Sequence, residues 1–128
     1  MKIVSMIARI LLALIFLVFG MNHYLNFIPT GPMPAGMAGQ FFGVLMTSHY
    51  IHVVAFFEVV PALLLVFNRY VPLALVVLGP VIVNIFLTGL LIATMALPMS
   101  IFLMVLWLLA AWRVRSAFLP LLQQKVAE

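Results

Sequence analysis

Cysteine is absent from this chain, and acidic residues are nearly absent, since Glu58 and Glu128 are the only two among 128 residues. Without cysteine, the chain itself forms no disulfide, thiolate metal site or iron–sulfur ligand set, and it performs no thiol redox chemistry. The sequence also lacks the spacing of a phosphate-binding loop, a nucleophile elbow and an HExxH zinc site. The motifs of these common enzyme classes are therefore missing.

Charge of either sign is scarce. Only 6% of the residues are charged, 68% are hydrophobic and the mean hydropathy is +1.38. A soluble domain is about half apolar and about a quarter charged. Because no soluble fold of this length hides so much apolar surface, the composition predicts a lipid bilayer as the surroundings. The six basic residues occur singly or in pairs, which indicates topology signals and not a nucleic-acid-binding patch.

Four apolar segments, about 3–22, 51–67, 71–95 and 98–119, are each close to the length of a membrane span. Such a span needs roughly 20 apolar residues. The turns after the second and third segments are very short, so these neighbours must be antiparallel. The sequence therefore predicts an all-α membrane protein with one domain, 1–128, built as an up-down four-transmembrane-helix bundle.

The basic residues predict the orientation of this bundle. In a chain with four spans they all fall on one side, while the first and third loops carry neither lysine nor arginine. The positive-inside rule then places both termini in the cytoplasm. The first segment has a basic start, but no small-x-small cleavage site follows it, so we expect it to be retained as a span. The basic residues are Lys2, Arg9, Arg69, Arg113, Arg115 and Lys125.

The first loop, about residues 22–50, is the only long one. Pro29, Gly31, Pro32 and Pro34 break regular structure at its start. Residues 35–47 follow with apolar side chains at helical spacing, but they are too few to span a bilayer. We expect a short interfacial helix here, which either anchors the loop in the interface or covers the bundle as a lid.

Glu58 is the most informative residue because it lies inside an apolar span. A carboxylate in hydrocarbon costs several kcal/mol unless it is paired, protonated or hydrated. Ala55 and Ala62 share its helix face, and small residues allow helices to approach closely in membranes. One hypothesis gives Glu58 a ligand or proton role. The alternative is a structural hydrogen bond that holds two spans together.

Arg9 and Asn84 are the candidate partners of Glu58. With a rise of about 1.5 Å per residue, Arg9 is about 9 Å from the start of its span and Glu58 is about 13 Å from the basic end of its own. These depths predict an Arg9–Glu58 contact, with Asn84 near the bilayer centre as another neighbour. Alternatively, Arg9 extends to the headgroups and Asn84 joins helices beside the kink at Pro80.

The three histidines, His23, His49 and His52, fall near the outer interface. His49 and His52 are three residues apart, so a metal site is the alternative to a simple interfacial position. Aromatic residues gather toward the same end and either form a slot for a quinone-like ring or only pack together. These aromatic residues are Phe41, Phe42, Phe56 and Phe57.

The ordered motifs resemble the DoxX family of small four-span bacterial membrane proteins. The matching stretches are 9–14 (RILLAL), 20–23 (GMNH), 41–43 (FFG), 58–60 (EVV), 68–74 (NRYVPLA) and 79–85 (GPVIVNI). The resemblance implies a bundle in the cytoplasmic (inner) membrane that associates with redox partners, one relative being a subunit of a thiosulfate:quinone oxidoreductase. It transfers Arg9, Glu58 and Asn84 as a polar site of unknown ligand, and His23 is a further candidate for this polar cluster. The chain departs from the family in lacking cysteine and in having His23 where many relatives carry lysine.

Three functions are compatible with these features. In the first, the chain is a membrane subunit of a redox system and binds a quinone or a small acid, with Glu58 as proton acceptor or hydrogen-bond partner. In the second, it is a non-catalytic accessory or structural subunit of a larger membrane complex. The expected partners are the lipid bilayer and either other proteins of a membrane complex or further copies of the chain. A transporter is the third and rests on the buried polar residues alone, since the sequence has no row of intramembrane acids.

Overall fold

The computed structural model describes residues 2–25 and 35–125, and this part of the chain is helical without any strand. Four long helices follow one another as α1 (Lys2–Leu25), α3 (Tyr50–Val66), α4 (Val71–Leu91) and α5 (Leu97–Arg113). The shorter α2 (Gly36–Thr47) stands between α1 and α3 and confirms the helix expected at 35–47. The prolines expected to break the first loop, and the terminal Glu128, lie outside the described residues.

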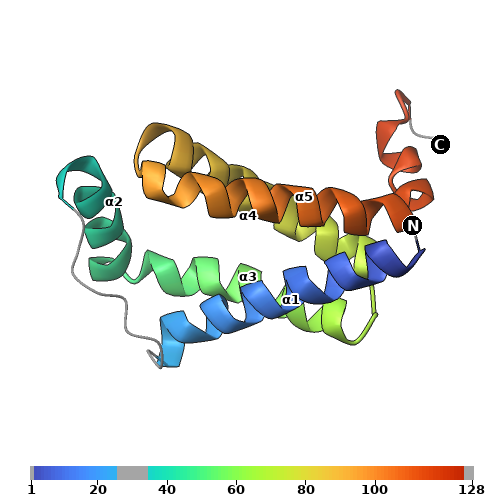
Figure 1. The fold of residues 1–128 in the computed structure, drawn as a ribbon, viewed down its shortest axis with the longest axis horizontal. Coiled ribbons are helices and arrows are strands. Elements are labelled where there is room, and N and C mark those ends of the chain that lie inside the picture. The colour runs from blue at the N-terminus through green and yellow to red at the C-terminus, as the bar shows by residue number, and fades with distance from the viewer. Residues whose placement is uncertain (1, 26–34, 126–128) are drawn as a thin grey trace.

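The four long helices form a ring in which α1 and α4 each pack against both α3 and α5. Figure 1 shows the start of α1, the α3–α4 turn and the end of α5 together at one end of the bundle, and α2 at the other. The antiparallel arrangement of successive long helices is therefore the one that the short turns predicted. The described lysine and arginine residues other than Arg9 lie at or near the end that contains the α3–α4 turn.

Three helical stretches are long and apolar enough to cross a membrane: Lys2–Leu25, Val71–Leu91 and Thr94–Arg113. The remaining candidate is a bent pair, Gly36–Thr47 with Tyr50–Val66, whose axes differ by 83°. The described residues therefore contain three membrane-spanning candidates, or four if the bent pair counts as one. These long apolar helices suggest a membrane protein.

The ends of two helices differ from the predicted segments. The fourth segment was expected to continue to about residue 119, but α5 ends at Arg113 and two short 3₁₀ turns, Arg115–Ala117 and Leu119–Leu122, follow it. The Arg115 guanidinium donates to the Trp112 carbonyl at 2.8 Å and lies over the Trp112 ring, 4.3 Å from its centre. A side chain that satisfies a terminal carbonyl favours ending the helix there. The third segment likewise ends at Leu91, before a 3₁₀ turn at Thr94–Ala96.

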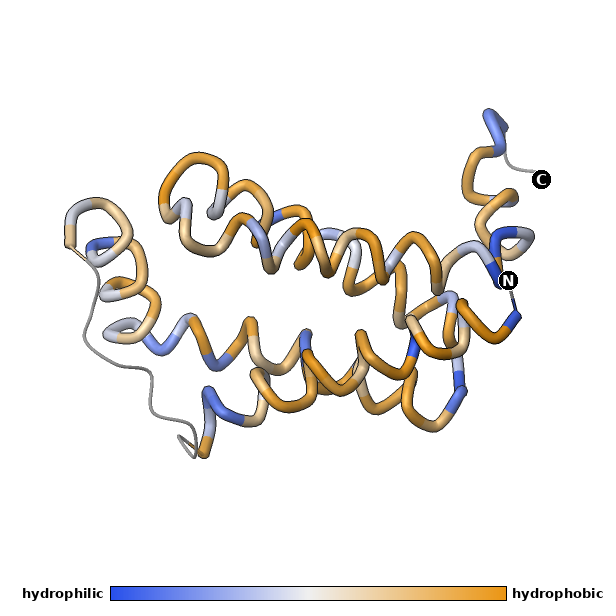
Figure 2. Tube along the Cα trace, in the orientation of Figure 1, coloured by the Kyte–Doolittle hydropathy of each residue, from blue (hydrophilic) through white to orange (hydrophobic). Residues whose placement is uncertain are grey.

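The bundle core is built mainly from leucine and alanine. The buried cluster draws on all four long helices, and alanines of α1, α3, α4 and α5 allow close contact between them. In the same core, the Trp107 indole N–H donates to the Leu75 carbonyl at 2.8 Å, which joins α5 to α4. Outside the core, large apolar side chains remain exposed on every long helix. Figure 2 shows this hydrophobic colouring along whole helices, as expected of helices surrounded by lipid.

Candidate functional site

The site depends on how α1 is aligned with α3. Near one end, the Arg9 guanidinium donates to the Leu65 carbonyl. Near the other end, the Tyr24 hydroxyl donates to the His52 carbonyl at 2.6 Å. Between them, a Cβ atom placed on Gly20 would be 3.4 Å from Glu58 Cβ. The two helices therefore run antiparallel along their length, with Glu58 opposite the last turns of α1.

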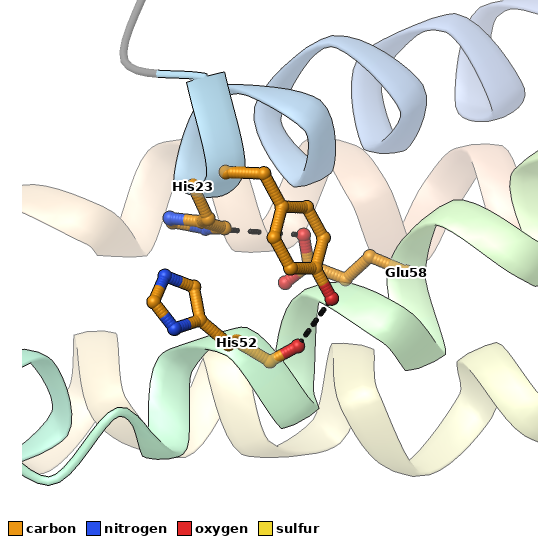
Figure 3. Close-up of polar contacts among 4 residues, drawn as sticks. His23, His52 and Glu58 are labelled. Carbon is orange, nitrogen blue, oxygen red and sulfur yellow. Dashed lines mark hydrogen bonds and ion pairs between the residues drawn. The ribbon is translucent and has the colours of Figure 1, made fainter.

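Glu58 is paired with His23 in this interface. The carboxylate residue is 6% exposed, and its Oε2 lies 4.0 Å from His23 Nε2. This separation places the imidazole beside the carboxyl group but is too long for a direct hydrogen bond. Figure 3 shows His23 coming from α1 and Glu58 from α3, with the imidazole directed toward the carboxylate. The only acidic residue in the described part of the chain is thus turned into the bundle and not toward lipid.

Two further histidines extend this pair toward the surface. The His52 ring stacks on Tyr24 with centroids 5.4 Å apart, and it stacks on His49 at the same separation. His49 and Tyr24 are exposed, whereas His52 is half-buried. Figure 3 shows the His23 and His52 rings on the same side of the Glu58 carboxylate. We call these five residues, His23, Tyr24, His49, His52 and Glu58, the histidine–glutamate cluster.

The Arg9–Glu58 contact expected from helix depth is not formed. The guanidinium of Arg9 is bound instead to the Leu65 carbonyl, two helical turns from Glu58. The depth estimate placed the basic ends of the two spans level with each other. In the structure, α1 begins at Lys2 well beyond the point where α3 ends at Val66. This offset moves Arg9 toward the end of α3 and brings His23 to Glu58.

Asn84 also lies away from the cluster. Its side chain is exposed, and its Nδ2 donates to the Pro80 carbonyl of its own helix at 2.9 Å. The Asn84 carbonyl in turn accepts a 2.8 Å hydrogen bond from the Thr88 hydroxyl. The side chains of Asn84 and Thr88 thus hydrogen-bond to backbone carbonyls of their own helix, α4, as Asn and Thr side chains often do. No described hydrogen bond joins Asn84 to Glu58, and the expected neighbourhood of these two residues stays a prediction.

The metal site that was the alternative for His49 and His52 has no third ligand among the described residues. Among residues 2–25 and 35–125, no group of three or more His, Asp or Glu side chains is placed to hold a metal ion. His49 and His52 stack face to face, with 14° between their ring planes. The phenylalanines of the proposed slot pair within their own helices, Phe41 with Phe42 and Phe56 with Phe57, each edge to face.

The cluster combines groups that exchange protons and form directed hydrogen bonds. Imidazole both donates and accepts near neutral pH, and a carboxylate accepts from hydroxyl or N–H groups. A buried ionisable residue within a membrane bundle is a candidate site for ligand binding or proton exchange. Serine or cysteine nucleophiles play no part in it.

Sequence reasoning grouped His23 with Arg9, Glu58 and Asn84 as candidates for one polar site, but it did not pair His23 with Glu58. His52 was assigned to the interface because its sequence position is close to the end of a span. The cluster forms because of the way α1 is aligned along α3. The apolar residues of the two helices do not specify this alignment. The sequence feature that could have indicated this pairing is Gly20, which lies on the same face of α1 as His23. Because glycine has no side chain, α1 can approach α3 closely at this position.

No protein-family model, curated protein or solved structure matches this chain. The resemblance to the DoxX family therefore stays a prediction from the ordered sequence motifs.

Proposed function

We propose that this chain is a DoxX-like subunit of a redox system in the bacterial cytoplasmic membrane, and that its histidine–glutamate cluster binds the headgroup of a quinone. All four long helices cross the bilayer, with both termini in the cytoplasm. Redox protein partners or further copies of the chain cover part of its apolar surface. The observation that carries the proposal is the buried Glu58–His23 pair, which lies beside the stacked rings of Tyr24, His52 and the exposed His49.

The chemistry of a quinone headgroup fits this cluster. A quinol presents hydroxyl groups that donate to a carboxylate, and a quinone presents carbonyl groups that accept from an imidazole N–H. Glu58 and His23 supply the acceptor and the donor from two adjacent helices. The protons that accompany ring oxidation or reduction by a redox partner protein pass between this pair and water by way of His52 and His49.

The basic end of the bundle supports the proposed orientation. Lys2 begins α1, Arg69 lies in the turn between α3 and α4, and Arg113 ends α5. Figure 1 places these three points at the same end. By the positive-inside rule, that end is cytoplasmic. The histidine–glutamate cluster then belongs to the half of the bundle nearer the outer surface.

Replacing Glu58 with glutamine is expected to weaken quinol binding about tenfold or more, because a hydrogen bond to a charged acceptor contributes about 1.5–3 kcal/mol. The glutamine keeps the shape of the side chain but neither carries the charge nor accepts a proton at the same atom. The measurement is calorimetric titration of decylubiquinol, kept reduced without oxygen, into the full chain in lipid nanodiscs.

Asn84→Ala is the matched control, because Asn84 is a polar residue of a long helix that bonds only within α4 in the described structure. We expect His23→Leu to weaken binding like Glu58→Gln, and Asn84→Ala to leave it unchanged. Absence of quinol binding by the native chain, or equal affinity in Glu58→Gln, would refute the quinone site and favour the accessory-subunit hypothesis.

A further inference from the structure

A polar pocket lies at the end of the bundle opposite the histidine–glutamate cluster. It has a volume of about 490 Å³ and is lined by Lys2, Ser5, Trp112, Arg113 and Arg115. The first two residues belong to the start of α1, and the others surround the end of α5. The pocket therefore brings together three cationic side chains, from the start of α1, the end of α5 and the 3₁₀ turn that follows it.

Nothing in the described structure neutralises these cations. Glu58 is the only described acid, and its ion-pair partner is His23. Arg115 is held by the Trp112 carbonyl and ring, which occupy one N–H donor and leave others available. A pocket with this charge attracts an anion. The first turn of α1 adds backbone N–H groups that lack helical partners, and their dipoles favour negative charge.

Ser5 gives a second, independent indication of a ligand. It is 2% exposed, lines the pocket, and its Oγ has no hydrogen-bond partner in the described residues. A buried hydroxyl left without a partner costs roughly 1–3 kcal/mol. Serine hydroxyls in helices ordinarily bond to a carbonyl of the preceding turn. An acceptor oxygen in the pocket would satisfy this donor.

We propose that this pocket binds a phosphate group. A phosphate offers several acceptor oxygens, which match two guanidinium groups, one ammonium group and a hydroxyl. Two sources supply this chemistry at the membrane surface, the headgroup of an anionic phospholipid and a soluble phosphate. Trp112 is half exposed beside the pocket, in the position that aromatic residues take at the level of the headgroups. The phosphate site shares no residue with the proposed quinone site, so the two proposals are tested independently.

The test compares variants that remove one or two positive charges from inside or outside the pocket. Native mass spectrometry of the full chain in detergent micelles measures the affinity for phosphatidylglycerol, with diacylglycerol, which lacks a phosphate group, as the comparison. We expect Lys2→Gln to weaken phosphatidylglycerol binding about fivefold and the double variant Arg113→Gln/Arg115→Gln about 25-fold, at roughly 1 kcal/mol per cation. Ser5→Ala is also expected to weaken phosphatidylglycerol binding, although it does not change the charge of the pocket.

Arg69→Gln is the control, since Arg69 lies at the same end of the bundle but does not line the pocket. A second arm measures radiolabelled inorganic phosphate by equilibrium dialysis against the chain in phosphatidylcholine nanodiscs. Binding of phosphatidylglycerol alone assigns a lipid headgroup, and binding of inorganic phosphate assigns a soluble source. The proposal is overturned if neither binds, or if Arg69→Gln weakens binding as much as Lys2→Gln, because the attraction is then diffuse.

Discussion

Replacing Gly20 with alanine is expected to destabilise the bundle by about 1–3 kcal/mol, the usual cost of overpacking a tight interface. Alanine in place of glycine inside a helix normally stabilises by roughly 0.5–1 kcal/mol, so the sign of the change is informative. The reason lies in α3: a Cβ on Gly20 would be 2.6 Å from Val59 Cγ2 and 3.5 Å from the Ala55 carbonyl oxygen. These contacts lie beside Glu58, so the substitution also moves His23 away from its partner.

The measurement for Gly20→Ala is the free energy of unfolding in mixed micelles with increasing SDS, followed by tryptophan fluorescence. Adding Val59→Ala removes the atom that clashes, and the double variant is expected to regain about 1 kcal/mol relative to the sum of the two single changes. Gly43→Ala is the control, because nothing lies within 4 Å of a Cβ at Gly43. A Gly20→Ala variant as stable as the native chain would show that α1 and α3 are further apart than described.

A methyl group at Gly89 is expected to cost more than one at Gly20, about 3 kcal/mol, at the upper end of overpacking effects. A Cβ there would be 2.8 Å from the Leu97 backbone nitrogen and 2.9 Å from its Cα. Backbone atoms at the start of a helix cannot rotate away as a valine side chain can. Gly89→Ala must therefore shift the whole turn between α4 and α5.

This difference predicts the outcome of a second cycle in the same SDS unfolding assay. Truncating Leu97 to alanine should not rescue Gly89→Ala, since the overlapping atoms are backbone. Gly79→Ala serves as the control in the same helix, because its Cβ would meet Trp107 at an ordinary 3.7 Å. A Gly89→Ala variant that is rescued by Leu97→Ala, or that unfolds like Gly79→Ala, is inconsistent with the described α4–α5 turn.

The sequence predicted the helices well because their determinants are local. Apolar runs, the prolines at the starts of α4 and α5, and short turns define the four long helices and their antiparallel succession. The end of α5 was less predictable. It depends on a contact between Arg115 and Trp112, whereas the predicted span continued for about six more residues.

The partners of polar residues were harder to predict, because they depend on the offset between helices. Arg9 and Glu58 were placed at similar depths only by assuming that the start of α1 and the end of α3 lie at the same depth in the membrane. Asn84 was expected to face a neighbour, but a hydrogen bond to the carbonyl four residues earlier is always within its reach. Glu58 itself was recognised from sequence, since an acid inside an apolar span requires a partner whatever the alignment.

The two candidate sites lie at opposite ends of the bundle and have different chemistry. Around Glu58, buried donors and acceptors from α1 and α3 suit a small neutral headgroup that exchanges protons. Around Ser5, cations from α1 and α5 suit an anion at the membrane surface. Substitutions at one end should therefore leave ligand binding at the other unchanged.

The crossing of α3 is the central claim, because this helix carries Glu58 and is the one span that qualifies only together with α2. The native chain has no cysteine, so a single introduced thiol gives an unambiguous signal. Ser48→Cys and Asn68→Cys, at the two ends of α3, are each labelled in intact cells with a membrane-impermeant maleimide. We predict that Ser48→Cys is labelled from outside and that Asn68→Cys reacts only after the membrane is opened. Labelling of both from the same side would contradict a four-span bundle and the proposed intramembrane site.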